Sequence, residues 1–170
     1  MRKRKYPRVE ITKEMLESAR EKIEEVDIKR TKASPIDTLV GILGEYAFAQ
    51  YYFGDWKANY VGKNKGKPDF GNIEIKASAY PFKESLHLLV REDYAIGRQP
   101  DKYVQIVIDV NSPNASKIMA GTEAVISGWA THDEVIDTDT KDYGSKSKAK
   151  GGYECHGIKI KNLKPMSSFE

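Results

Sequence analysis

The chain has 170 residues, of which 39% are hydrophobic and 31% are charged. This composition is typical of one globular domain and excludes a disordered chain. No apolar run approaches the ~20 residues of a membrane helix, and no apolar segment follows the basic N-terminus as in a secretory signal. The single cysteine, Cys155, excludes an internal disulfide and a cysteine-rich zinc site. We therefore expect a cytoplasmic protein.

The net charge of +3 is unevenly distributed along the chain. Positive residues are concentrated in three segments, residues 1–8, 57–67 and 141–150. We expect a basic N-terminal arm over 1–10, followed by a single domain over 11–170. Such segments suit contact with nucleic-acid phosphates, although lysine-rich loops can also be merely solvated. The candidate phosphate-binding residues are Arg2, Lys3, Arg4, Lys5, Lys63, Lys65 and Lys67.

Two helices are predicted first. Apolar residues recur at helical spacing over residues 12–26, with charged residues between them. A second helix is predicted over 35–53, because Pro35 suits the first helical position and Gly54 follows the last apolar residue. This second helix is apolar over much of its surface and should be largely buried. Glu45 lies in the middle of it and is the only acid between Asp37 and Asp55.

The rest of the chain is predicted to be mostly strands. The expected strands are 57–61, 67–70, 73–79, 86–90, 103–110, 122–129 and 153–160, with short helices over 91–97 and 131–136 and a loop over 138–152. Residues 86–90 and 103–110 are apolar enough to be central strands. The order predicts an α+β or mixed α/β fold with a central mixed sheet flanked by helices.

The residues from Lys67 to Lys76 form the most informative segment. Gly71-Asn72 between two strand-like runs predicts a two-residue hairpin turn. With that turn, Phe70 opposes Ile73 and Asp69 opposes Glu74. Because side chains alternate along a strand, Asp69, Glu74 and Lys76 share one face, and Phe70, Ile73 and Ile75 share the core face.

Paired carboxylates predict a cation site on this hairpin. Asp69 and Glu74, as direct cross-strand neighbours, would repel each other unless a divalent cation bound between them. Carboxylate oxygens suit Mg²⁺, with Mn²⁺ as a substitute. Proline at position 68 has no N–H for the strand ladder, so the backbone carbonyl of Ile75 is a candidate third ligand. An ordinary solvated hairpin face remains the alternative.

Pro68-Asp69 followed by Glu74-Ile75-Lys76 resembles the motif of the PD-(D/E)XK nuclease superfamily, which has the restriction-endonuclease-like fold. The helix containing Gly41-Ile42-Leu43-Gly44-Glu45 is similar to the one that often contributes a further acid in that superfamily. The resemblance covers about residues 36–110. Four residues separate Asp69 from Glu74, which is at the short end for such enzymes.

The resemblance implies metal-dependent cleavage of phosphodiester bonds. Asp69, Glu74 and the Ile75 carbonyl would hold Mg²⁺, and Glu45 would bind it through water or bind a second ion. Lys76 would orient or help deprotonate the attacking water. We expect a DNA endonuclease, and the resemblance makes a homodimer the expected oligomer.

Two other readings stay open. The chain could be a non-catalytic nucleic-acid-binding protein that keeps the fold, or an interaction domain whose charged hairpin has no catalytic role. His87 lies in an apolar strand and is expected to be structural. The pair Cys155-His156 falls short of a zinc or nucleophile motif.

Overall fold

The computed structural model describes most of the chain. The described residues are 6–27, 35–58, 70–98, 100–113, 115, 117–142 and 154–169. The helices are α1 (Lys13–Asp27), α2 (Pro35–Phe53), α3 (Glu92–Arg98) and α4 (His132–Ile136), with 3-10 turns η2 (Ile160–Asn162) and η3 (Met166–Ser168). The strands are β1 (Arg8–Glu10), β2 (Ile73–Ala79), β3 (His87–Arg91), β4 (Lys102–Ile108), β5 (Glu123–Thr131), β6 (Thr140–Asp142) and β7 (Glu154–Lys159).

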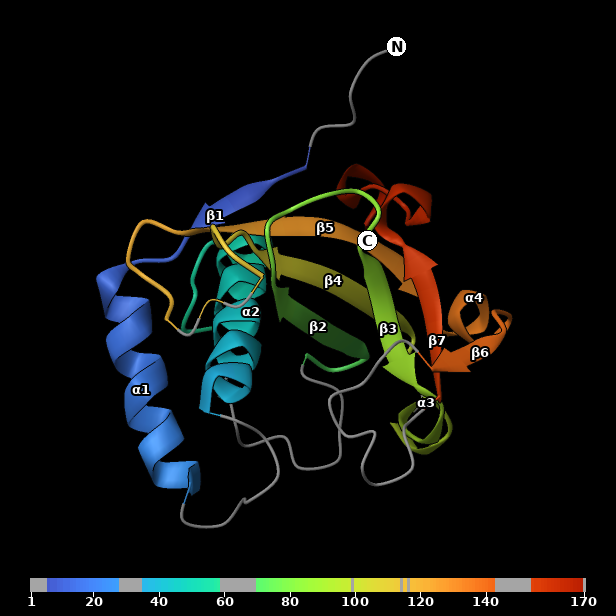
Figure 1. Cartoon of the computed structure of the whole chain (residues 1–170), viewed down its shortest axis with the longest axis horizontal. Coiled ribbons are helices and arrows are strands. Elements are labelled where there is room, and N and C mark those ends of the chain that lie inside the picture. Colours follow the sequence, from blue (N-terminus) through green and yellow to red (C-terminus); the bar gives the residue numbers. More distant parts are fainter. Residues whose placement is uncertain are drawn as a thin grey trace.

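The strands form two sheets. The central sheet has the order β1-β5-β4-β2, in which β2 and β4 are parallel and the other pairs antiparallel. A second, antiparallel sheet has the order β3-β7-β6. Figure 1 shows α1 and α2 side by side at one end of the molecule and the second sheet at the other. The fold is therefore α+β with a mixed central sheet, as the element order predicts.

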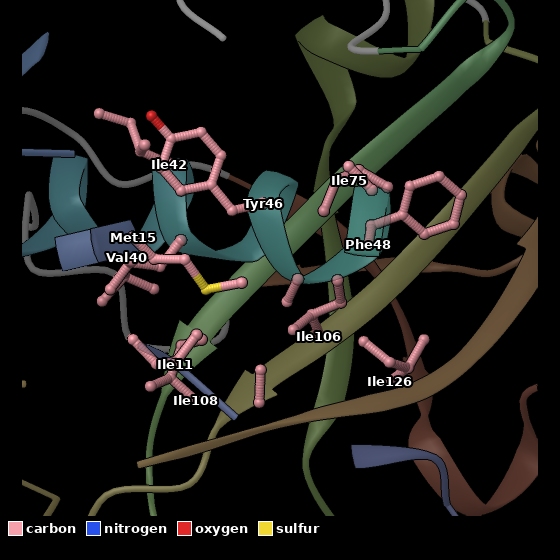
Figure 2. Close-up of a cluster of buried hydrophobic side chains, with 14 of the residues drawn as sticks. Ile11, Met15, Val40, Ile42, Tyr46, Phe48, Ile75, Ile106, Ile108 and Ile126 are labelled. Carbon is pink, nitrogen blue, oxygen red and sulfur yellow. The ribbon is translucent and has the colours of Figure 1, made fainter. Parts of the chain in front are cut away.

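Two apolar clusters cover the two faces of the central sheet. One packs α1 and α2 against Ile75, Ile106 and Ile108 (Figure 2). The other packs Tyr103 and Val107 of β4 against β3, α3, α4 and the segment after β7. Helices thus cover one face, as expected, but the opposite face is covered mainly by the second sheet.

Helix α2 is the principal element of the first cluster. Its buried side chains include Leu43, Tyr46 and Phe48. Each fully buried large apolar side chain contributes ~1.5–3 kcal/mol to folding. The prediction that this helix is largely buried is confirmed. Gly44 lets its backbone approach β2, because a Cβ atom at that position would lie 2.5 Å from the Cβ of Ala77.

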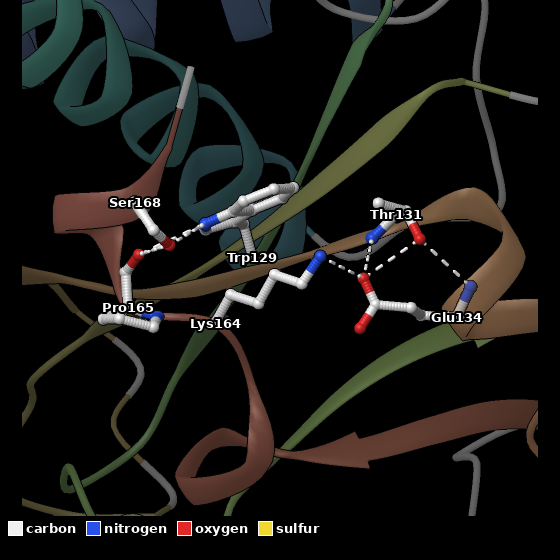
Figure 3. Close-up of polar contacts among 6 residues, drawn as sticks. All are labelled: Trp129, Thr131, Glu134, Lys164, Pro165 and Ser168. Atoms are coloured by element: carbon white, nitrogen blue, oxygen red, sulfur yellow. Dashed lines mark hydrogen bonds and ion pairs between the residues drawn. The ribbon is translucent and has the colours of Figure 1, made fainter.

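The segment after β7 is fastened to β5 around Trp129 (Figure 3). The Trp129 indole Nε1 donates hydrogen bonds to the Pro165 carbonyl and to Ser168 Oγ, both at 3.2 Å. Lys164 forms an ion pair of 2.9 Å with Glu134. Glu134 itself completes a capping box with Thr131 at the start of α4.

Several sequence-based expectations need correction. The strand predicted over 86–90 is β3, which lies at the edge of the second sheet and not in the central one. Lys57 and Ala58 form a turn and bend where a strand was predicted to begin, and residues 59–61 lie outside the described part. Residues 8–10, assigned to the basic arm, pair with β5 as strand β1. Strand β6 begins within the predicted loop 138–152. Local apolar pattern identifies strands but not their partners, which explains these errors.

Candidate active site

The predicted hairpin turn is present. Phe70 and Ile73 exchange two backbone hydrogen bonds, each 2.9 Å between N and O, across Gly71-Asn72. Gly71 has φ +59°, a conformation that favours glycine. The Asn72 carbonyl accepts the backbone N–H groups of Asp101 and Lys102, at 2.8 and 3.2 Å. The turn is therefore tied to the start of β4, and it fixes the register with which β2 begins.

Strand β2 divides its side chains between the two faces of the sheet. Ile75 and Ala77 face α2, where they lie nearest to Gly44. Glu74 and Lys76 pair in register with Tyr103 and Gln105 of β4. Tyr103 belongs to the cluster on the opposite face. Glu74 and Lys76 consequently share the face directed toward the second sheet, as the alternation predicts.

The predicted core face is also confirmed. Phe70 and Ile75 are buried in the cluster beneath α2, and Ile73 packs against it. The register of the turn is therefore correct at its described positions. Asp69 and Pro68 lie outside the described residues, so the placement of Asp69 opposite Glu74 stays a prediction.

Glu74 is an unusually buried carboxylate. Its side chain is 3% exposed, and the Lys76 ammonium, on a side chain that is 23% exposed, lies 3.9 Å from its Oε2 atom. Burying a charge is costly unless opposite charge or hydrogen bonds compensate. Lys76 supplies part of that compensation. Away from bulk water, the attraction of Glu74 for any further cation is also stronger than on an open surface.

Tyr103 borders Glu74 on the same face. Burial, followed by the negative charge of Glu74, raises the pKa of the Tyr103 hydroxyl to about 12. This hydroxyl therefore stays protonated at neutral pH, and it forms a hydrogen bond of 3.2 Å with Nδ1 of His132. His132 begins α4, which confirms the short helix predicted over 131–136.

Gln105 extends the polar surface along the two strands. It is buried, and its Nε2 donates to Ser78 Oγ at 3.3 Å and to the Ile106 carbonyl at 3.2 Å. Neither Gln105 nor Tyr103 was among the sequence-predicted site residues. The signal for Gln105 was its position as the one amide within an apolar strand. Tyr103 carried no comparable signal, because most tyrosines simply border a core.

Glu45 lies in the helical layer. Gly44, the preceding residue, contacts the Ile75 and Ala77 side of β2, whereas Glu74 and Lys76 project from the other side. Glu45 is partly exposed. To meet Glu74 it would have to reach past the edge of the central sheet at β2. Convergence of Glu45 with Glu74 and Lys76 stays a prediction.

The donor set for a metal ion is only partly within the described chain. Among residues whose positions are described, no three or more His, Cys, Asp or Glu side chains form a metal-binding group. Glu74 fits a hard cation through its buried carboxylate, and the Ile75 carbonyl next to it remains a candidate. Asp69, Lys63, Lys65, Lys67 and the basic residues Arg2, Lys3, Arg4 and Lys5 all lie outside the described residues.

The other histidines have structural surroundings. Burial, together with the nearby charges of Lys159 and Lys141, lowers the pKa of His87. His156 is buried, and its Nδ1 lies 2.8 Å from the Thr138 carbonyl oxygen. That contact ties β7 to the segment preceding β6. These surroundings agree with the structural role expected for His87 and with the weak motif at Cys155-His156.

Comparisons of the chain with protein-family models, with curated proteins and with solved structures found no match. Within the described residues, no helix has the length and apolar character needed to cross a membrane.

Proposed function

We propose that this protein is a Mg²⁺-dependent nuclease that hydrolyses phosphodiester bonds of DNA, with a restriction-endonuclease-like core. One observation carries the proposal: the buried Glu74 carboxylate and the Lys76 ammonium lie 3.9 Å apart on one sheet face, directly after the Gly71-Asn72 turn. This is the part of the PD-(D/E)XK-like motif that the described residues contain. Mn²⁺ is the expected substitute for Mg²⁺.

Each of the two side chains has a defined task in this proposal. Glu74 supplies a hard oxygen ligand whose burial strengthens its attraction for a cation. Lys76 stabilises negative charge on the scissile phosphate and orients the attacking water. A bound Mg²⁺ would lower the pKa of that water and act as a Lewis acid on the phosphate.

The remaining residues complete the proposed site. Asp69, which the predicted hairpin register sets opposite Glu74, is the proposed second carboxylate ligand, and the Ile75 carbonyl is the proposed third ligand. Glu45 acts through water or on a second ion. The basic residues Lys63, Lys65 and Lys67, with Arg2, Lys3, Arg4 and Lys5, attract the DNA backbone through its phosphates. A homodimer would place two such sites on the two strands of a duplex.

The connection between β2 and β4 supports the proposed core. Strands β2 and β4 are parallel neighbours in the sheet, although β3 and α3 lie between them in the chain. The candidate residues of β2 therefore lie beside the buried strand β4. Helix α2 precedes the hairpin and packs on β2. Glu74 and Lys76 are thereby held by a regular strand rather than by a loop, which favours precise positioning of catalytic groups.

A metal-dependent cleavage assay tests the proposal. Supercoiled plasmid, linear duplex and single strands are incubated with the protein in Mg²⁺, Mn²⁺ or EDTA. We expect cleavage in either metal and none in EDTA, and loss of cleavage in Glu74→Gln and Lys76→Ala. Glu123→Gln is the matched control, because Glu123 also pairs with a cation, Arg8, at 3.4 Å but lies at the other end of the sheet. A pure protein that cleaves none of these substrates in either metal would contradict the proposal.

A non-catalytic DNA-binding protein with the same fold is the second candidate. In this alternative the Lys76 ammonium, 3.9 Å from Glu74, balances the buried carboxylate without a metal ion. It predicts binding that is unaffected by Mg²⁺ and by Glu74→Gln, with no cleavage product.

A further inference from the structure

A cluster of aromatic rings lies at the end of the central sheet where β2 and β4 begin. It joins the C-terminal end of α2 to the hairpin and to the C-terminal segment. We call it the aromatic end surface. Its members are Phe48, Tyr52, Phe53, Phe70, Trp129 and Phe169, each with its ring centroid 4.9 to 5.9 Å from that of another member.

The cluster has a buried base and an exposed top. Phe48, Phe70 and Trp129 are buried, whereas Tyr52 is 43% exposed and Phe53 is 51% exposed. The exposed rings are held from below: Tyr52 stacks on Phe48 at 5.3 Å, and Phe53 lies 5.9 Å from Phe70. Exposed aromatic rings that pack on buried rings and adjoin one another are typical of a binding surface.

Lysine side chains lie over rings at this end of the molecule. The Lys102 ammonium is 5.1 Å from the Phe169 ring centroid and 5.4 Å from that of Trp129. Lys57, just beyond α2, lies 5.0 Å from the Trp56 ring centroid.

The surface is close to the candidate active site. Phe70 pairs with Ile73 across the turn, and Glu74 is the next residue in β2. The rings lie on the side of the sheet that α2 covers, whereas Glu74 projects from the opposite side. A DNA strand stacked on the exposed rings would have to pass the end of the sheet at the Gly71-Asn72 turn to reach Glu74.

We propose that the aromatic end surface binds unpaired DNA bases by stacking, so that the substrate of the proposed nuclease includes a single-stranded part. This rests on the proposed function for its link to cleavage. Flat rings stack on every base, and ammonium groups beside them suit the phosphates that join the bases. Asp55 and Asp101 neighbour Lys57 and Lys102 in the chain and partly offset their charge, so the proposal rests on stacking rather than on net charge.

Binding is measured by fluorescence anisotropy in EDTA, with labelled oligo-thymidine and with an abasic strand of equal length. Both probes carry the same phosphates, so only base stacking separates them. We expect the thymidine strand to bind more tightly, by roughly five- to a hundredfold as found for base–aromatic stacking. Phe53→Ala should remove most of this difference. Tyr52→Leu, which keeps apolar contact with Phe48 but removes the aromatic ring, should reduce it.

Tyr80→Ala is the matched control, because Tyr80 also has a lysine over its ring, Lys83 at 5.4 Å, but lies just after the end of β2. It should leave the preference for bases unchanged. Thermal melts verify that each variant is folded. Equal affinity for the thymidine and abasic strands in the folded wild type would overturn the proposal. Dissociation of a dimer by Phe53→Ala would also overturn it, because the surface would then be an interface between two copies of the chain.

These outcomes are separate from those of the cleavage assay. Base-dependent binding without cleavage in Mg²⁺ would support the surface and contradict the nuclease. Cleavage without any preference for bases over abasic strand would support the nuclease and overturn the stacking surface.

Discussion

Gly44 of α2 and Ala77 of β2 meet so closely that a Cβ atom on residue 44 would lie 2.5 Å from the Ala77 Cβ. A methyl group at this position cannot be accommodated without moving the helix from the sheet. The distance between α2 and β2, and with it the placement of Glu45 relative to the candidate site, depends on this contact.

Gly44→Ala should therefore destabilise the protein by ~1–3 kcal/mol, the usual cost of overpacking a core. Gly41→Ala is the matched control in the same helix, because a Cβ there has nothing within 4 Å. It should be neutral or stabilise by up to ~1 kcal/mol, since alanine restricts the unfolded chain. Urea unfolding of the three proteins measures both effects. Equal stabilities for the two variants would contradict the close contact.

Lys76→Ala should destabilise the metal-free protein by about 1–3 kcal/mol, because the buried Glu74 carboxylate loses a compensating cation. Mg²⁺ should stabilise this variant at least as much as the wild type, since lysine is not a ligand and no longer competes for Glu74. Thermal melts with and without Mg²⁺ test this, with Glu74→Gln as the variant that should lose the Mg²⁺ effect. If Glu74→Gln keeps the full effect, the ion binds elsewhere.

Asp69→Asn tests whether the hairpin register that starts with the Phe70–Ile73 pair continues with Asp69 opposite Glu74. If Asp69 faces Glu74, removing its charge should leave the metal-free stability unchanged or raise it by ~0.2–1 kcal/mol, the range for cross-strand pairs. Mg²⁺ should then stabilise the variant less than the wild type, and cleavage should fall to background. A solvated hairpin face predicts the opposite: Asp69→Asn destabilises, and Mg²⁺ has no effect on either protein.

Charge reversal at Lys63 and Lys65 should weaken DNA binding and reduce its salt dependence by about one unit of logarithmic slope per lost phosphate contact. Thermal stability should change by no more than ~0.5 kcal/mol, as for most exposed substitutions. Binding titrations over a range of salt concentrations provide the measurement. A slope equal to that of the wild type would show that these lysines make no phosphate contact.

Glu134 should make stability depend on pH. Burial disfavours its ionised form, but hydrogen bonds from Lys164 and Thr131 outweigh burial, so its pKa is lowered. A carboxyl group whose pKa is lowered by folding stabilises above its unfolded pKa, and this contribution is lost as pH falls through the folded pKa. The melting temperature of the wild type should therefore exceed that of Glu134→Gln at neutral pH. The difference between the two melting temperatures should shrink as the pH is lowered. A gap that is constant with pH would rule out this linkage.

The element types were largely predictable from local pattern. Helical spacing of apolar residues identified α1 and α2, and Pro35 and Gly54 marked the bounds of α2 within a residue. The Gly71-Asn72 turn was equally local, because its conformation depends on the residues within it. With the turn defined, period-two alternation placed Glu74 and Lys76 on one face and Ile75 on the other. These features needed no knowledge of distant contacts.

Other features depended on contacts between residues far apart in the chain. The apolar runs that became β3 and β4 look alike in sequence, yet they lie in different sheets, since strand pairing is decided by the packing of the whole domain. The burial of Glu74, its neighbours Tyr103 and Gln105, and the aromatic end surface arise only when β4, β5 and the C-terminal segment assemble beside the hairpin. The sequence by itself thus determined which residues share a strand face, because alternation is a property of the extended backbone. Only the tertiary structure decided which residues contact that face and how deeply it is buried, because those contacts come from segments tens of residues away in the chain.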